Sequence, residues 1–432
     1  MNEIYLNTRS LLSDGKWTAG VIGLGYVGLP LLVSTVTKGL AGIGFDVSTK
    51  RITDLSSGKS HIDDISDADL AAAAQGDIKY TANPNDLAKA DVIFICVPSP
   101  LGRNRQPDLS FIEAASETVA RIARPGQVVS LESTTYPGTT EDYLVPAVKR
   151  AGLTLDEDVF VAFSPERVSP GDDMKTAEIP KVVGGVTPKS GELAAAAYRR
   201  IVPAVHVVSS ARVAELSKLL ENTYRAVNIG LVNEMAQLAH ELGIDIWEAV
   251  EAAATKPFGF QAFWPGPGVG GHCIPLDPQY LSWRAREANF ATRFIDLAEQ
   301  VNSKMPSYNA SRIADVLNGL GKAVHGSRIL VIGVAYKSDI ADDRESAAYD
   351  VIAELSRRGA IVEVLDPVVG AERIKSRGLI PSKSLEGYDL AAILTDHSTI
   401  DYRKVSEEVP VVFDARGVYR RLRIEVANVV AL

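Results

Sequence analysis

The most reactive side chain that the sequence offers is a cysteine in a loop rich in glycine and proline. Cys273 follows Gly270-Gly271-His272, and Asp277 comes four residues after it. Adjacent glycines let a ligand approach the backbone closely, and a thiolate is a strong nucleophile near neutral pH. A thiol buried for packing is the alternative. Because no second Cys or His ligand is spaced nearby, we predict no metal site. A neighbour in sequence often points elsewhere, so an effect of His272 on the thiol stays open.

A second chemical signal lies near the start of the chain. Gly23-x-Gly25-x-x-Gly28 follows an apolar segment and opens a helical pattern, and Asp46 ends the next apolar segment, 18 residues after Gly28. This spacing is typical of a dinucleotide turn, in which a pyrophosphate lies at the helix N-terminus. A carboxylate at Asp46 binds ribose hydroxyls and repels a 2'-phosphate, which favours NAD over NADP. The alternative is a tight turn without a ligand. NAD together with a positioned thiol indicates oxidation through a thioester.

Polar residues at three further places could serve the same chemistry. Lys218 and Asn222 are spaced i and i+4, so one helix face carries both, and together they could hold a water or an oxyanion. Thr134 and Glu166 each follow an apolar strand pattern, and strand ends of such sheets face the cofactor. From spacing alone, a solvated helix face is the favoured interpretation of Lys218 and Asn222, and ordinary turns explain Thr134 and Glu166 equally well.

Lys337 and the run 343–346, which contains Arg344, follow an apolar strand pattern in the second half of the chain. One Lys and one Arg near a strand–helix turn suit the charge of a diphosphate. A solvated run of charges is the alternative reading.

The pattern of helices and strands that must position these residues predicts an α/β protein. Apolar strands alternate with helical patterns up to about residue 210, and a long helical stretch runs from 211 to 243. We predict two Rossmann-like doubly wound parallel-sheet domains joined by a long central helix. The predicted boundaries are 1–210 for an NAD-binding domain, 211–320 for a central helical and dimerisation domain with the cysteine loop, and 321–432 for a domain that binds a nucleotide moiety.

Composition narrows the class of protein. The chain has 432 residues, a formal net charge of -9 and two cysteines. Its acidic balance without a basic patch argues against a nucleic-acid partner. Two cysteines do not make a disulfide framework, and Cys96 lies inside an apolar strand pattern, so we expect it in the core. No apolar run reaches membrane-spanning length and no signal peptide is visible, which predicts a cytoplasmic protein without a membrane partner.

Taken together, these residues resemble the nucleotide-sugar 6-dehydrogenases, the group that contains UDP-glucose and GDP-mannose dehydrogenases. The resemblance runs from Gly23 to about Arg416. It rests on motifs in a fixed order: the glycine fingerprint, Ser133-Thr134, Ser164-Pro165-Glu166, Lys218 with Asn222-Thr223-Tyr224, Gly271-His272-Cys273, Lys337, and Arg344-Glu345-Ser346.

The resemblance implies an NAD-dependent four-electron oxidation of a UDP-hexose C6 alcohol to a uronate, with Cys273 forming a thioester. It implies that Lys218, Asn222 and Asp277 support the oxyanion or water, that Thr134 holds the water, and that Glu166 assists as base. The implied NAD site comprises Gly23, Gly25, Tyr26, Val27, Gly28, Asp46, Arg51, Pro98, Thr134 and Arg344. The implied sugar-nucleotide site comprises Glu166, Arg167, Lys218, Asn222, Phe258, Phe260, Gly271, Lys337 and Arg416. The long helix implies a homodimer or a higher homo-oligomer.

One position departs from the UDP-glucose branch. That branch carries a second acidic residue four positions after the Glu of its Pro-Glu motif, whereas this chain has Pro170. The pattern resembles the branch that acts on N-acetylated hexosamines, so we predict UDP-N-acetylglucosamine as substrate, then UDP-N-acetylmannosamine, then UDP-glucose. A two-electron hydroxyacid dehydrogenase is the alternative of another class, but it leaves Cys273 and the second half unexplained. A non-catalytic sensor of NAD or nucleotide sugars is a third hypothesis.

Overall fold

The computed structural model describes residues 2–62, 64–102, 106–167, 178–271 and 273–432. The chain divides into two compact units, one formed by Met1–Glu221 and Gln279–Asn289 and the other by Asn222–Pro278 and Phe290–Leu432. Among the described residues, no helix is both long and apolar enough to cross a bilayer.

The first unit is built on one sheet. In the described residues its strand order is β3-β2-β1-β4-β5-β6-β7-β8. Neighbouring strands pair in parallel except β6 and β7, which pair antiparallel. The prediction of a parallel sheet is therefore wrong at this one pair, because an apolar run reveals a strand but not its direction. The strands are β1 (Thr18–Ile22), β2 (Ala41–Phe45), β3 (Ile78–Thr81), β4 (Val92–Ile95), β5 (Val128–Leu131), β6 (Phe160–Phe163), β7 (Lys181–Gly185) and β8 (Val205–Val208).

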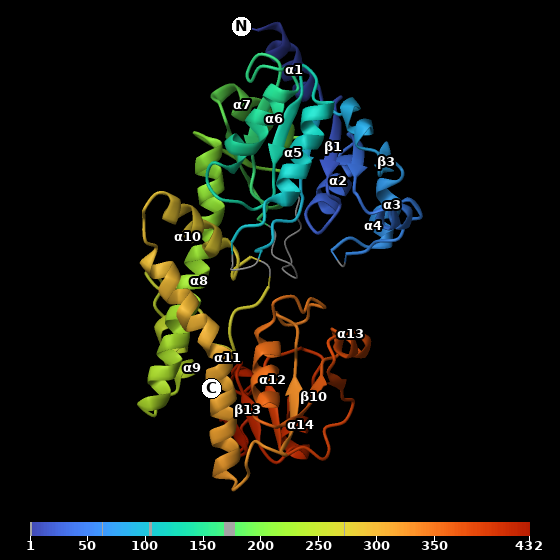
Figure 1. Ribbon diagram of the computed structural model, residues 1–432. Coiled ribbons are helices and arrows are strands. Elements are labelled where there is room, and N and C mark those ends of the chain that lie inside the picture. Colours follow the sequence, from blue (N-terminus) through green and yellow to red (C-terminus); the bar gives the residue numbers. More distant parts are fainter. Residues whose placement is uncertain (1, 63, 103–105, 168–177, 272) are drawn as a thin grey trace. The chain divides into compact units, whose positions relative to one another are not determined.

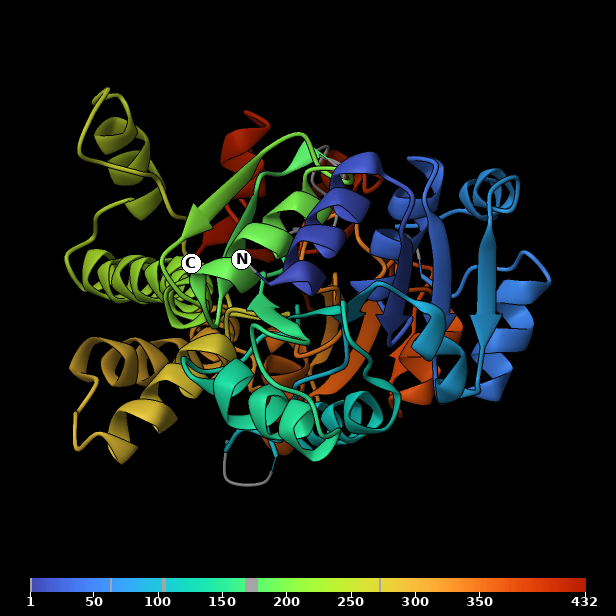
Figure 2. The same ribbon diagram turned by 90° about the horizontal axis from the view of Figure 1, so that it is seen from above.

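Helices cover both faces of this sheet, as Figures 1 and 2 show. Apolar side chains from α1, α2, α4 and α7 fill one face, and those of α5 and α6 fill the other. A sheet buried on both faces explains why β4, β5 and β6 are apolar without alternation. The helices are α1 (Glu3–Asp14), α2 (Gly28–Thr37), α3 (Thr49–Ser56), α4 (Asp67–Ala73), α5 (Ser110–Ile122), α6 (Val145–Arg150), α7 (Pro188–Tyr198) and α10 (Asp277–Glu287).

The strand order reverses between β1 and β4. From β1 the chain proceeds outward to β2 and β3, and from β4 it proceeds the other way. Ligands of open α/β sheets bind at such a switch point, beyond the carboxyl ends of the strands. Gly23 directly follows β1, so the fold puts the fingerprint at this point.

Helix α8 (Ala211–Glu241) is 31 residues long. Its second part packs with α11 (Arg293–Gly319) in the second unit. A Cβ on Gly230 would lie 3.1 Å from Cα of Ala298, so a glycine lets the two backbones approach. The amide of Asn233 donates to Asn302 at 3.0 Å, which satisfies two polar groups buried between the helices. The prediction of a long helix from residue 211 is confirmed.

The second unit contains a parallel sheet. Within the described residues, its strand order is β11-β10-β9-β12-β13-β14, with a switch point between β9 and β12. Buried apolar clusters lie on both of its faces. Its elements are α9 (Ile246–Ala254), β9 (Arg328–Ile332), α12 (Ala347–Arg357), β10 (Ile361–Leu365), α13 (Ala371–Ser376), β11 (Ile380–Pro381), β12 (Leu390–Ile393), α14 (Tyr402–Glu408), β13 (Val412–Asp414), α15 (Val418–Arg421) and β14 (Val429–Ala431). The predicted fold class is confirmed in both units.

Candidate active site

The turn after β1 requires its glycines. Gly23 has φ of 91°, and a Cβ there would lie 2.7 Å from the carbonyl oxygen of Cys96 on β4's continuation. A Cβ on Gly28 would lie 1.9 Å from the carbonyl oxygen of Gly23. Around Gly25, by contrast, no heavy atom lies within 4 Å of the Cβ position. Two glycines therefore close the turn, and the third leaves an open approach to its backbone.

Two further features of this turn fit a dinucleotide. No side chain caps the start of α2 at Val27, and an uncapped helix N-terminus suits a phosphate. Asp46, after β2, is buried, and its carboxylate accepts from the amides of Leu24 at 3.0 Å and Ser48 at 2.9 Å. Its salt bridge to Arg51 is 2.6 Å long. Burial alone would raise the pKa of Asp46, but these amides and Arg51 outweigh it and lower the pKa.

The other predicted cofactor residues of the first unit lie at strand ends. Tyr26 is exposed within the turn itself. Pro98 follows β4 and is exposed, and Thr134 follows β5 and is half-buried. The ends of β1, β4 and β5 are neighbours in the sheet, so the structure brings these residues to one edge.

Glu166 and Arg167 follow β6 in the first unit. One carboxylate oxygen of Glu166 accepts from the amide of Arg167 at 2.8 Å. Arg167 forms a 2.8 Å salt bridge with Glu221 on α8. Lys218, one turn before Glu221, is only 7% exposed, and no ion pair joins its ammonium to another described residue. A buried ammonium of this kind is available to a ligand.

The cysteine loop belongs to the second unit, where it packs on the residues that follow β9. Cys273 is exposed, and its carbonyl accepts from the amide of Asp277 at 2.9 Å, which fixes the start of α10. Gly271 has φ of 83°, and its amide donates to the carbonyl of Arg344 at 3.2 Å. A Cβ there would lie 2.9 Å from the ring of Tyr336. The glycine therefore permits both the turn and the close packing.

Asn222 and Asp277 meet in this unit. Both are buried, and the amide of Asn222 donates to the carboxylate of Asp277 at 2.5 Å. The sequence places these residues 55 positions apart, and the fold joins them as a hydrogen-bonded pair.

Charged candidates of the second unit are held by acidic neighbours. Arg344 binds Asp342 with two nitrogens, at 2.9 and 2.6 Å. Arg416 pairs with Asp396 at 3.2 Å, and a Cβ on Gly266 of the long loop would lie 2.7 Å from its guanidinium.

Lys337 is half-buried in the loop after β9. Phe258 and Phe260 are both exposed in the loop that precedes Cys273.

Two sequence observations lie outside the described residues, the neighbour His272 and the departure at Pro170. The prediction for Cys96 is confirmed, because this thiol is buried in the core of the first unit. Burial raises the pKa of Cys96 well above its ordinary value, so it is not a nucleophile.

A buried charged group that no sequence motif predicted lies behind Glu166. Lys181, the first residue of β7, forms a 2.5 Å ion pair with Glu132, which follows β5, and lies 3.6 Å from Glu166. A charged residue at the border of each apolar strand is the signal that could have found it.

Three family models match successive parts of the chain. They describe the NAD-binding domain of the UDP-glucose/GDP-mannose dehydrogenase family over residues 18–202, its central domain over 212–304 and its UDP-binding domain over 330–421. The chain belongs to this family. It is therefore an NAD-dependent nucleotide-sugar dehydrogenase, as the resemblance implied.

Similar proteins carry three different substrate names. UDP-N-acetyl-D-glucosamine 6-dehydrogenase of Pseudomonas aeruginosa is 36% identical, covering 92% of this chain and 96% of its own. A solved structure of UDP-D-ManNAc dehydrogenase from Pyrococcus horikoshii has a TM-score of 0.85 at 33% identity, covering 93% of this chain and 96% of its own. UDP-glucose dehydrogenase from Pyrobaculum islandicum has a TM-score of 0.83 at 27% identity, covering 93% and 94%. The family is common to all three, and the sugar is not.

Proposed function

We propose that this protein oxidises C6 of a UDP-hexose to a carboxylate in two steps, with Cys273 as the covalent nucleophile. The alcohol first becomes an aldehyde. The thiolate of Cys273 then adds to the aldehyde carbon, and the resulting thiohemiacetal loses a hydride to become a thioester. NAD, when bound, accepts the hydride in each oxidation. Water finally breaks the C–S bond, which releases the uronate and restores the thiol.

The observation that carries this proposal is the exposure of Cys273 in a loop that glycines hold close to the residues after β9. The second cysteine, Cys96, is buried and so offers a contrast within the same chain. A nucleophile must be accessible, and a thiol kept for packing is not.

Other side chains of the chain support the same chemistry. In the proposed reaction Lys218 and Asn222 stabilise the oxyanion, with Asp277 orienting the amide of Asn222 through their hydrogen bond. Thr134 holds the hydrolytic water, and Glu166 takes its proton. Removing one oxyanion donor reduces kcat by about 100-fold to 1000-fold.

For the substrate we propose UDP-N-acetylglucosamine. The motif departure at Pro170 supports it, and so does the name of the Pseudomonas relative. The proposed nucleotide-sugar residues of the second unit are Lys337, Arg416, Phe258 and Phe260. Arg344 is proposed to bind NAD. The cytoplasm is the proposed compartment of the protein.

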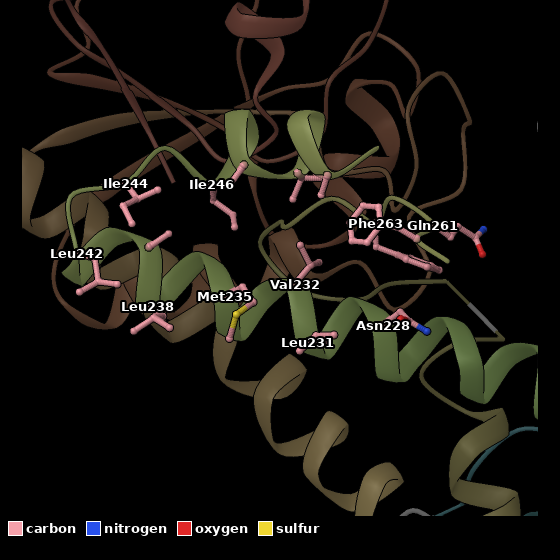
Figure 3. A pocket seen from close by; sticks show the side chains of 15 residues that line it. Asn228, Leu231, Val232, Met235, Leu238, Leu242, Ile244, Ile246, Gln261 and Phe263 are labelled. Atoms are coloured by element: carbon pink, nitrogen blue, oxygen red, sulfur yellow. The ribbon is translucent and has the colours of Figure 1, made fainter. Parts of the chain in front are cut away.

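We propose further that the protein forms a homodimer through the second part of α8. An apolar groove of about 340 Å³ lies there between α8, α9 and the following loop, and Figure 3 shows the side chains that line it. Leu231 is 55% exposed and Leu242 is 62% exposed in the single chain. Contiguous exposed apolar surface of this kind marks an interaction site.

The oxidation is tested by mixing the pure protein with NAD and each UDP-sugar in turn, and by measuring NADH and product. We expect two NADH per uronate, with the highest kcat/KM for UDP-N-acetylglucosamine. One NADH per free aldehyde or ketone would instead show a two-electron dehydrogenase. Tight binding of both ligands without turnover would show a sensor.

The dimer is tested by light scattering after chromatography. We expect the Leu238→Glu variant, changed inside the groove, to elute as a monomer. Ile380→Glu is the matched control, because this exposed side chain lies on β11 and does not line the groove. A dimer that persists in Leu238→Glu would contradict the proposed interface.

A further inference from the structure

Behind the proposed base Glu166, the first unit holds a buried network that has no part in the proposed reaction. Glu132 is 1% exposed and Lys181 is 4% exposed. They come from the ends of β5 and β7, on the two sides of β6, whose continuation carries Glu166. Three adjacent strands therefore direct two carboxylates and one ammonium to a single buried point.

The ammonium of Lys181 lies near three oxygen atoms, two within hydrogen-bond distance and one within ion-pair distance. It lies 2.5 Å from a carboxylate oxygen of Glu132, 3.5 Å from the carbonyl of Pro165 and 3.6 Å from a carboxylate oxygen of Glu166. The other oxygen of Glu166 accepts from the amide of Arg167 at 2.8 Å. The carboxylate of Glu166 is thus held from both sides.

A second layer fixes Glu132 in turn. The hydroxyl of Tyr198, at the end of α7, donates to Glu132 at 2.7 Å. This uses the single phenol proton, so the contact of 2.9 Å with Ser130 must be one in which Ser130 donates. The ring of Tyr198 also lies 5.6 Å from the ammonium of Lys181. Each member of the network therefore has a defined donor or acceptor role.

The charges around the network do not cancel. Burial raises the pKa of Cys96 and of Tyr198, so both are neutral beside Lys181. Arg167 is paired with Glu221. Lys181 therefore lies within ion-pair distance of two carboxylates, those of Glu132 and Glu166. Burying an ion pair seldom stabilises a fold more than apolar residues of the same size, which leaves a functional reason for retaining this one.

We propose that Lys181 and Glu132 are positioning residues that hold the carboxylate of Glu166 in one orientation for proton transfer. This inference rests on the proposed function of Glu166 as base. Lys181 attracts the carboxylate of Glu166 to one side, and Glu132, held by Tyr198, stops the flexible lysine from turning away. Neither residue is proposed to touch the substrate.

The test uses the double variant Lys181→Met/Glu132→Gln. Changing one partner alone would strand a buried charge and could unfold the protein, whereas the double variant keeps the volumes and removes both charges. With the UDP-sugar that the wild type oxidises fastest, we expect kcat to fall about 10-fold to 100-fold. We expect KM to change by less than about threefold.

Two comparisons separate positioning from mere structure. In a Glu166→Gln background, the double variant should lower kcat by less than about threefold, since the residue it serves is already gone. Equal losses in both backgrounds would overturn the inference while leaving the proposed function intact. The control is Lys79→Met/Asp86→Asn, which removes a 2.7 Å ion pair of the same unit and should leave kcat unchanged. A wild type that oxidises no UDP-sugar would overturn both proposals.

Discussion

The turn after β1 and the turn after β9 are held by the same two interactions, one made by a glycine amide and one by a buried Asp, which together are called the clasp. In both, a glycine with positive φ, Gly23 at 91° and Gly333 at 82°, donates its amide to the end of the neighbouring strand. In both, a buried Asp accepts amides of the turn, Asp46 at 3.0 Å and Asp366 at 2.7 Å.

The two turns differ in the length of the path to the next helix. Helix α2 starts at Gly28, five residues after Gly23, whereas α12 starts at Ala347, 14 residues after Gly333. The clasp therefore holds a strand end, and the short glycine path into a helix is the added feature that suits a pyrophosphate. The long path after β9 instead carries Lys337 and Arg344 and receives the cysteine loop.

The largest expected effect is the loss of the second clasp. A Cβ on Gly333 would lie 2.1 Å from the carbonyl oxygen of Thr395 at a φ of 82°. We expect Gly333→Ala to destabilise the second unit by about 4 kcal/mol or more. Urea unfolding measures it. Gly378→Ala is the control, because its φ is also positive but no atom lies within 4 Å, so it should lose only about 1 kcal/mol.

Glu215, a buried acid of the first unit that also accepts turn amides, should show the opposite pH dependence of stability to Asp366. Glu215 of α8 accepts from the amides of Gly138 and Thr140, at 2.6 and 2.9 Å. Burial raises its pKa to about 7, more than these amides lower it. A raised pKa gives stability that is complete below about pH 4.5 and disappears as pH rises to about 7.

The shift in the pKa of Glu215 corresponds to a change of about 3 kcal/mol in the free energy of unfolding over that pH range. We expect the free energy of unfolding of the wild type, minus that of Glu215→Gln, to fall between pH 4.5 and 7 and then stay level. Chemical unfolding of both proteins at each pH measures it, and the subtraction cancels the other titrating groups. A difference that rises with pH would contradict this account of Glu215.

Asp366 should show the reverse. Burial raises its pKa, but the donated hydrogen bond from His397 and the amides of Val369 and Val334 outweigh it and lower the pKa to about 2. A lowered pKa gives stability that is present above about pH 3.8 and lost as pH falls towards 2. We expect Asp366→Asn to remove about 2 kcal/mol of this pH-dependent stability, seen as a flatter acid unfolding curve. An unchanged curve would show that the second clasp does not hold its strand end electrostatically.

Of these changes, Gly25→Ala should have the smallest effect on stability and the clearest effect on NAD binding. No atom lies near its Cβ position, so Gly25→Ala should fold like the wild type. A methyl group in the open approach to the backbone should weaken NAD binding at least about 10-fold, which is about 1.4 kcal/mol. Titration calorimetry with NAD measures it, and Gly319→Ala, equally uncrowded, is the control. Unchanged affinity would remove Gly25 from the proposed NAD site.

The sequence predicted the features that depend on neighbours along the chain. The strand, the glycine spacing and Asp46 form one local pattern, and the buried strand around Cys96 is equally local. It could not predict that β7 runs antiparallel to β6, because strand direction leaves no mark on an apolar run. It also could not predict that Lys181 meets Glu132 or that Asn222 meets Asp277, because such pairs depend on which strands and loops become neighbours in space.

The most direct test of the central claim is to trap the acyl group on Cys273. The Glu166→Gln variant, which slows the proposed hydrolysis, is mixed with NAD and UDP-N-acetylglucosamine, quenched in acid and analysed by peptide mass spectrometry. The account predicts a uronyl mass on the Cys273 peptide, none on the Cys96 peptide, and none when NAD is omitted. Uronate formed with two NADH while Cys273 stays unmodified, or undiminished turnover in Cys273→Ser, would contradict it.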